Sequence, residues 1–211
     1  MTGTSNYDAV AKRFTESEYG DPGRYFAHRA DLVVSLGTLL EPDDEVLDLA
    51  CADATFAAPL LARGLRYRGV DASAAMLDVA RGRLGDRAAL DEGDVFAYAP
   101  PAPVAATTIF RSLHFVDDRV AFFRRVAGYT DKKLVFDASP RRESLGLLQA
   151  QLREAGWEHT VTRPFFVPQH ARLPGPVASA LESAERVPVL AGLLLRVRFA
   201  VLVCGYRGSN V

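Results

Sequence analysis

Two aspartates accompany short apolar runs at a spacing that suggests a ligand site. The first run, EVLDLA at 45–50, is typical of a buried strand; it contains Asp48 and leads into a tight run of small residues. The second run ends at Asp71 in GVDAS, 23 residues after Asp48. This is about the separation between a dinucleotide-type turn and its ribose-binding carboxylate. Because parallel strands end at the same edge of a sheet, the pair predicts a nucleoside site.

The chemistry of a nucleoside explains why acids suit these positions. A vicinal diol offers two hydrogen-bond donors, and an ionised carboxylate accepts two hydrogen bonds in a fixed geometry. A third acid, Asp94 in EGDVF, follows 23 residues after Asp71. An acid there can accept a hydrogen bond from the exocyclic amine of a base.

The elements that position these acids alternate along the chain. Apolar runs bounded by turn residues predict strands, and apolar residues at helical spacing predict helices. Strands alternating with helices of this length indicate βαβ units and a parallel sheet. The predicted strands are residues 45–49, 67–70, 88–91, 105–110, 133–137, 158–163 and 196–206. The predicted helices are residues 6–19, 24–40, 55–63, 73–84, 117–129, 142–155 and 177–186.

The composition indicates one domain without a nucleic-acid partner. The 211 residues are 49% hydrophobic and 24% charged, with a formal net charge of −1. That length suits a single domain, and a near-neutral chain without a basic run lacks the electrostatic footprint of a nucleic-acid-binding protein. The two cysteines lie far apart and have no spacing typical of a zinc site, so no metal is expected.

No segment of the sequence predicts secretion or membrane insertion. The N-terminus lacks a basic region followed by an apolar run, so it does not resemble a signal peptide. The most apolar stretch, 187–206, carries Arg196 and Arg198 in its middle, which is unfavourable for a membrane span. We therefore expect a cytoplasmic protein without a membrane partner, either a monomer or a homodimer.

These motifs resemble those of class I S-adenosylmethionine-dependent methyltransferases over nearly the whole chain, from about residue 7 to 206. In that family the first strand ends in an acid-x-Gly-x-Gly-x-Gly turn, and Asp48, Ala50, Ala52 and Ala54 occupy the matching positions. The segment IFRSLHFVDD at 109–118 is similar to the family's substrate-facing loop after the fourth strand.

The resemblance implies a Rossmann-like three-layer α/β sandwich that uses S-adenosyl-L-methionine as cofactor. Its seven-stranded sheet would be mostly parallel, with one antiparallel strand at 196–206. Residues 1–42 would form an N-terminal helical lid, 43–163 the cofactor-binding core, 164–195 a substrate-cap insertion and 196–211 the last strand. The implied reaction is in-line transfer of a methyl group to an oxygen, nitrogen or carbon of a small molecule, with a natural product or small metabolite fitting best.

The resemblance also implies roles for individual residues. Asp71 would bind the ribose hydroxyls, and Asp94 would lie close to the adenine. His114 is the expected general base, because an imidazole suits proton removal near neutral pH. The residues expected to bind the cofactor are Asp48, Ala50, Ala52, Asp53, Asp71, Ala72, Met76, Asp94, Val95 and Arg111. Those expected to bind the acceptor are Tyr19, Tyr25, Arg111, His114 and His170.

The chain departs from the family at all three glycines of the turn. Glycine serves there because the backbone needs positive φ and must approach the ligand closely. Each alanine adds a methyl group on that surface, and Ala52 faces the expected cofactor most directly. Asp53 has two readings: it caps the following helix, or it approaches the amino group of the methionine moiety.

Two alternatives stay open. A methyltransferase-like fold could have lost methyl transfer and could act as a cyclase-like catalyst or a non-catalytic partner. An NAD-dependent Rossmann enzyme is a weaker reading, because it needs a GxGxxG turn with the pyrophosphate at a helix N-terminus, and CADATF at 51–56 contains no glycine.

Overall fold

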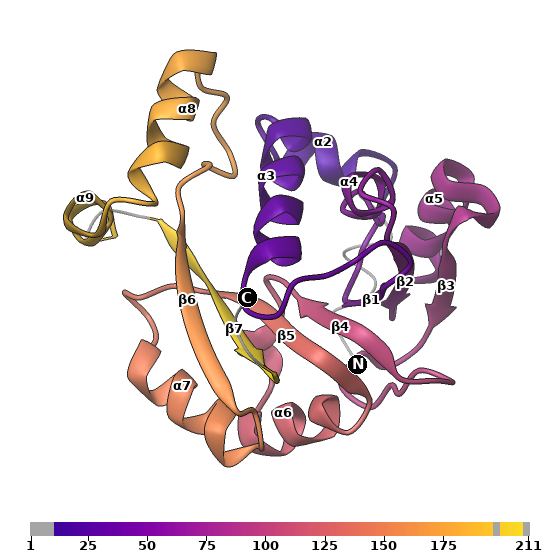
Figure 1. Ribbon diagram of the computed structural model, residues 1–211. Helices are drawn as coiled ribbons and strands as arrows, with labels where there is room; N and C mark the ends of the chain where they lie inside the picture. Colours follow the sequence, from indigo (N-terminus) through magenta and orange to yellow (C-terminus); the bar gives the residue numbers. More distant parts are fainter. Residues whose placement is uncertain (1–10, 196–198, 209–211) are drawn as a thin grey trace.

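A seven-stranded sheet in the order β3-β2-β1-β4-β5-β7-β6 forms the centre of the computed structural model, which describes residues 11–195 and 199–208 (Figure 1). The strands β1 to β5 run parallel, and β7 is antiparallel to both β5 and β6. The strands are β1 Glu45–Leu49, β2 Arg66–Asp71, β3 Ala89–Glu92, β4 Val104–Ile109, β5 Thr130–Ala138, β6 His159–Phe165 and β7 Ala200–Tyr206. The predicted mostly parallel sheet with one antiparallel strand is confirmed.

Helices cover both faces of the sheet, which gives the predicted three layers. Successive strand residues point to opposite faces, so Val46 packs into the core with α3, α4 and α5, while Leu47 packs into the core with α6 and α7. The helices are η1 Ala11–Arg13, α2 Phe14–Glu18, α3 Pro22–Ser35, α4 Ala57–Leu61, α5 Ala74–Leu84, η2 Gly85–Arg87, η3 Leu113–Phe115, α6 Arg119–Ala127, α7 Leu145–Glu154, α8 Gly175–Ala184 and α9 Pro188–Leu194.

Local signals explain where several helices begin and end. Ser73 accepts a hydrogen bond from the backbone N–H of Met76 and caps α5, close to the start that the sequence predicts for the helix at 73–84. The helix predicted at 24–40 instead begins at Pro22, because Asp21 caps it by accepting from Arg24 N–H. It ends at Ser35, and Gly37 then adopts a φ of 68°. Residues 6–10 of the helix predicted at 6–19 and residues 196–198 of the strand predicted at 196–206 lie outside the described residues.

The apolar segment before the last strand forms a helix that the sequence analysis did not predict. In α9, Val189 is 75% exposed and Leu193 is 58% exposed. These two side chains therefore do not belong to the core. Figure 1 shows α8 and α9 at the side of the molecule, at the ends of β6 and β7.

The N-terminal helices are docked onto the segment between β6 and α9. The backbone N–H of Gly20 donates to the carbonyl of Gln169 at 2.8 Å. One turn further along, Arg24 pairs with Glu182 of α8 at 2.7 Å. His28 contacts the buried carboxylate of Glu185 at 2.8 Å. Segments more than a hundred residues apart in sequence thus lie side by side near the carboxyl edge of the sheet.

We predict that Gly20→Ala weakens this docking. A Cβ at Gly20 would lie 2.7–2.9 Å from backbone atoms of Ala171 and Arg172, and backbone atoms cannot yield as a flexible side chain can. We expect the free energy of unfolding to fall by about 1–3 kcal/mol, measured by urea denaturation. Gly23→Ala is the matched control, because its Cβ would meet only Asp21 at 3.8 Å. Equal stability of the two variants would contradict the prediction.

Candidate functional site

The turn after β1 keeps a glycine-like backbone although it contains alanine. Ala50, Ala52 and Ala54 have φ values of 60°, 49° and 50°. These are left-handed conformations, which place the Cβ of an L-residue too close to the backbone and cost roughly 1–2 kcal/mol each. The backbone therefore keeps a positive φ at every second position of the turn. The surrounding structure has to stabilise this conformation.

Asp71, at the end of β2, lies directly against this turn. Its Oδ2 accepts from the backbone N–H of Ala52 at 2.8 Å, and its Oδ1 accepts from Ser73 N–H at 2.9 Å. The parallel pairing of β1 with β2 brings the two strand ends together. The structure therefore places the predicted ribose-binding acid beside the predicted cofactor turn.

Asp48, which is expected to bind the cofactor, is buried in the core beneath the turn. Its residue is 4% exposed, and its two carboxylate oxygens accept from the hydroxyls of Tyr67 at 2.8 Å and Thr108 at 2.6 Å. Burial raises the pKa of Asp48 to about 6, and the two hydroxyls oppose this shift. The side chain thus supports the floor of the turn from within the core.

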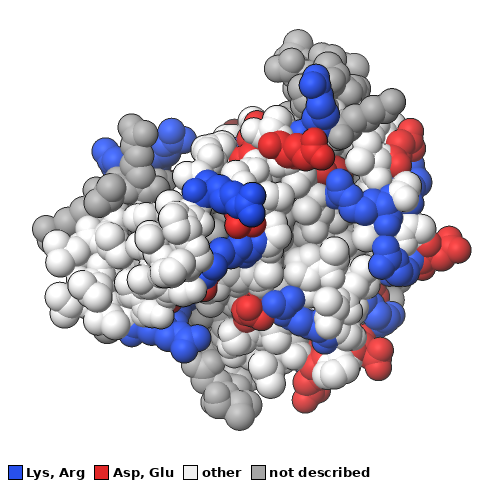
Figure 2. Space-filling view, turned by 90° about the horizontal axis from the view of Figure 1, so that it is seen from above, with Lys and Arg blue, Asp and Glu red and all other residues white. Residues whose placement is uncertain are grey.

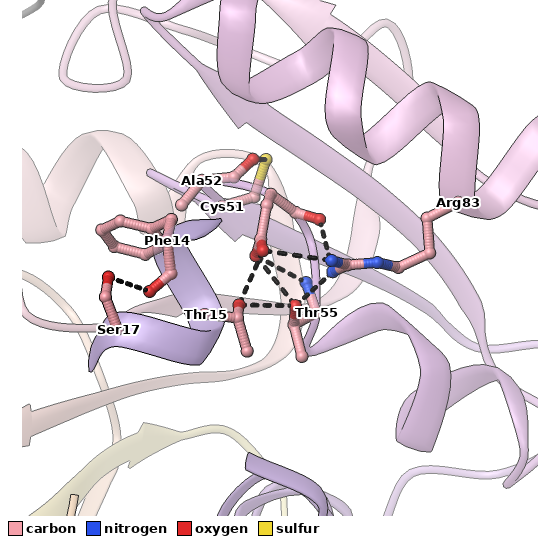
Figure 3. Close-up of polar contacts among 8 residues, drawn as sticks. Phe14, Thr15, Ser17, Cys51, Ala52, Thr55 and Arg83 are labelled. Atoms are coloured by element: carbon pink, nitrogen blue, oxygen red, sulfur yellow. Dashed lines mark hydrogen bonds and ion pairs between the residues drawn. The ribbon is translucent and has the colours of Figure 1, made fainter. Parts of the chain in front are cut away.

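Asp53 joins the turn to two helices, and Figure 3 labels three of its hydrogen-bond partners, Thr15, Thr55 and Arg83. Its Oδ2 accepts from Thr15 of α2 at 2.6 Å and from Arg83 of α5 at 3.2 Å. Its Oδ1 accepts from the hydroxyl of Thr55 at 2.9 Å. Asp53 is not the N-cap of α4, which begins at Ala57 after Phe56, so the capping reading is wrong.

The remaining predicted cofactor residues lie along the neighbouring strand ends. Asp94 is exposed and accepts from the backbone N–H of Phe96 at 2.9 Å. Val95 and Met76 are buried, and Ala72 is exposed at the end of β2.

Three of the predicted acceptor-binding residues are brought together. The rings of Tyr19 and Tyr25 lie 4.9 Å apart between centroids. Arg111, which follows β4 and has a φ of 59°, extends its guanidinium to the Tyr19 hydroxyl at 3.4 Å and to Glu18 at 3.0 Å. The N-terminal segment and the loop after β4 therefore meet over the same edge of the sheet.

Two residues that the sequence analysis missed lie beneath this cluster. Arg29 is 1% exposed, and its guanidinium lies over the rings of Tyr25, Phe110 and Phe165 at 4.2–5.0 Å. Its Nη2 atom lies 3.7 Å from Oδ2 of Asp137, at the end of β5. The Oδ1 atom of Asp137 accepts a hydrogen bond from the backbone N–H of Arg111 at 2.7 Å. The strand-end signal that selects Asp71 in VDAS recurs at Asp137 in FDAS. No pattern distinguishes Arg29 on its helix.

The two histidines that are expected to bind the acceptor lie outside the cluster of Tyr19, Tyr25 and Arg111. His114 is exposed on η3, with its ring 4.0 Å from that of Phe115. His170 is exposed on the segment between β6 and α8. Among the described residues, neither histidine shares a hydrogen bond or ring contact with Tyr19, Tyr25 or Arg111. The proline-rich segment of His170 nevertheless borders the N-terminal helices through the Gly20–Gln169 hydrogen bond.

The face shown in Figure 2 carries no basic patch, and the described part of the chain holds no metal-binding cluster. Figure 2 shows basic and acidic side chains interspersed over the face that it views. Within residues 11–195 and 199–208, no group of three or more His, Cys, Asp or Glu residues could hold a metal ion. In the same residues, no helix combines the length and apolarity that crossing a membrane requires.

Comparison with known proteins agrees with this geometry. A sequence profile described as a methyltransferase domain matches residues 46–132, which contain the turn, Asp71 and the edge of β4. This match agrees with the resemblance of the chain to class I S-adenosylmethionine-dependent methyltransferases. A search of curated protein sequences gave no significant match to it.

Solved structures share the fold of the methyltransferase domain at low identity. The Haemonchus contortus phosphoethanolamine N-methyltransferase 2 has a TM-score of 0.61 and 13% identity over 86% of this chain, which spans 52% of that protein. A chain in the complex of the Haloferax volcanii Trm112 methyltransferase activator with its methyltransferase partner has a TM-score of 0.65 and 16% identity, over 99% of this chain and 98% of that one. The [4+2]-cyclase SpnF has the same TM-score and identity, over 97% and 94%. At these identities the likeness concerns the fold, and the fold alone does not set the reaction.

The buried Asp48 of the methyltransferase domain predicts a pH-dependent stability term. Its folded pKa of about 6 lies above its ordinary value of 3.8, so the native state binds more protons than the unfolded state between these values. The wild type should gain stability relative to Asp48→Asn as the pH falls from 7 to 4. Urea denaturation across that range measures the difference. The exposed Asp78, substituted by Asn, is the control, and a constant difference between wild type and Asp48→Asn would contradict the assignment.

Proposed function

We propose that this chain transfers a methyl group from S-adenosylmethionine to an oxygen, nitrogen or carbon of a small-molecule acceptor. The observation that carries the proposal is the left-handed turn at Ala50, Ala52 and Ala54 with the Asp71 carboxylate held against it. When bound, S-adenosylmethionine supplies an electrophilic methyl group on sulfur. The protein then has to orient the acceptor in line with that methyl and, where the acceptor needs it, remove a proton.

The residues at the ends of β1, β2 and β3 fit this cofactor. We assign the ribose hydroxyls to Asp71 and the adenine to Asp94 and Val95. The backbone of Ala50 and Ala52 would line the methionine end, because positive φ at alternate positions opens the turn toward a ligand. Asp48 would act from below, where it holds Tyr67 and Thr108.

The acceptor side is assigned to the edge formed by β4, β5 and the N-terminal helices. Tyr19, Tyr25 and Arg111 would line it, with His170 approaching from the cap segment. His114 is proposed as the general base for acceptors that need one, because it follows β4 directly on η3. A small acceptor, such as a natural product or metabolite, is favoured because the chain is near neutral and the face shown in Figure 2 carries mixed charges, not a basic patch for a polyanion.

Calorimetric titration with S-adenosylmethionine and, in parallel, S-adenosylhomocysteine tests the cofactor assignment. We expect micromolar binding of at least one of the two. A folded protein that binds neither would overturn the proposal and would favour a cyclase-like or non-catalytic role for the same fold.

Asp71→Ala should weaken cofactor binding by about 100-fold or more, because it removes a charged acceptor for two ribose hydroxyls. Calorimetry measures the change, and circular dichroism checks that the fold is retained. Asp78→Ala is the matched control, because Asp78 is an exposed acid on α5 that pairs with its helix neighbour Arg81 at 2.9 Å. Wild-type affinity in Asp71→Ala would refute the ribose assignment.

Restoring glycine at Ala52 should leave cofactor binding at least as tight as in the wild type. The substitution removes a methyl group from the ligand-facing turn and relieves a left-handed alanine with φ of 49°. Calorimetry and urea denaturation provide the measurements. Ala58→Gly, in α4, serves as the contrast, since glycine within a helix costs about 1 kcal/mol. Clearly weaker binding by Ala52→Gly would mean that the site is built around the alanine methyl.

A further inference from the structure

The side chain of Asp53 is a buried charge in the middle of the turn. It stands between the left-handed residues Ala52 and Ala54, and its side chain is 4% exposed. Burying a carboxylate is unfavourable unless donors replace the lost water. The contacts of Asp53 therefore determine which arrangement of the neighbouring elements is stable.

The donors come from three different parts of the chain (Figure 3). Thr15 of α2 donates to Oδ2 at 2.6 Å, and Thr55 of the turn donates to Oδ1 at 2.9 Å. The two threonine hydroxyls also lie 2.7 Å apart. Arg83 of α5 donates to Oδ2 at 3.2 Å and to the backbone carbonyl of Asp53 at 3.0 Å. One carboxylate thus connects the N-terminal helix, the turn and the helix after β2.

These contacts differ in how strongly each stabilises the buried carboxylate of Asp53. The Arg83 side chain is 39% exposed, so solvent screens its charge and can replace it. Thr15 is 8% exposed, and its hydrogen bond to Asp53 is buried. If α2 moved away, Asp53 would lose this buried donor, and an unsatisfied charged acceptor is strongly destabilising. The position of α2 and the conformation of the turn are therefore coupled through Thr15 and Asp53.

Helix α2 also reaches the acceptor side of the site. Glu18, one turn after Thr15, pairs with Arg111 at 3.0 Å, and the next residue, Tyr19, has its ring 4.9 Å from that of Tyr25 on α3. A short helix is thus held at one end by the turn and at the other by the loop after β4.

We propose that Asp53 is a positioning residue that locks α2 onto the alanine turn, and that retention of S-adenosylmethionine depends on its hydrogen bond with Thr15. The part concerning retention rests on the proposed function. The part concerning the lock does not, because it follows from the contacts of Asp53 alone. Strained left-handed alanines persist only where the surroundings fix them, and the donors around Asp53 provide this restraint from both sides of the turn.

Thr15→Val tests the proposal, because valine keeps the shape of threonine and removes its donor. Hydrogen exchange should become about ten-fold faster both in residues 11–18 and in the turn at 51–56, since losing a donor to a buried charge corresponds to roughly this factor or more. The dissociation rate of S-adenosylhomocysteine, measured by stopped-flow displacement, should rise by a similar factor. Thr15→Ser keeps the hydroxyl and should restore wild-type behaviour.

Ser17→Ala is the matched control on the same helix, because the Ser17 hydroxyl donates to the nearby carbonyl of Phe14 within α2. It should change neither the exchange of the turn nor the dissociation rate. Asp53→Asn supplies an independent variant that keeps the size of the side chain and loses the charge, and it should also accelerate both processes.

The outcomes separate this proposal from the proposed function. If Thr15→Val lowers the melting temperature but leaves exchange in the turn and ligand dissociation unchanged, Thr15 is only structural and the proposal is overturned. If the wild type binds no cofactor, the proposed function fails, and the exchange of residues 51–56 in Thr15→Val still decides the lock: faster exchange supports it and unchanged exchange overturns it.

Discussion

The site depends on one backbone constraint, the left-handed conformation of Ala50, Ala52 and Ala54. Alanine does not favour this conformation, so the turn exists only because other groups hold it. Asp71 holds it from β2 by accepting from Ala52 N–H, and Asp53 holds it through donors on α2 and α5. The acids that the sequence suggests as ligand groups are therefore also the groups that shape the turn. In the proposed function, the Asp71 carboxylate both shapes the turn and binds the cofactor.

The charged residues around the turn differ in how deeply they are buried. Asp48 and Arg29 are buried close to the carboxyl edge of the sheet, and each is surrounded by hydroxyls or aromatic rings. Glu18 and Arg111 form a more exposed pair above them. Buried groups fix the floor of the site, because they lose stabilisation when a partner moves. Exposed groups gain little from pairing and can exchange partners when an acceptor enters. For the proposed function, this arrangement would combine a rigid turn at the cofactor with a more adaptable surface at the acceptor.

Several features were predictable because they rest on local patterns. The strand at Glu45–Leu49 and the Ser73 cap of α5 follow from apolar runs and capping chemistry. Asp137 had the same strand-end signal as Asp71 and was overlooked. Arg29, Thr15 and Thr55 carried no comparable signal, because their importance comes from partners that are distant in sequence, more than a hundred residues away for Arg29 and Asp137. The helix at Pro188–Leu194 was not predicted either, since an apolar run of that length gives no clear period.

The sequence by itself determined the alternation of strands and helices, the acids at the strand ends and the resemblance to a methyltransferase. These properties are encoded locally, by periodicity and by residue types at fixed spacing. Only the tertiary structure decided that three alanines adopt positive φ, that Asp48 lies in the core, and that Asp53 binds the N-terminal helix. Each of these results depends on which groups meet in space. A strained backbone or a buried charge is stable only when distant residues supply its hydrogen bonds, and sequence spacing carries no direct record of such contacts.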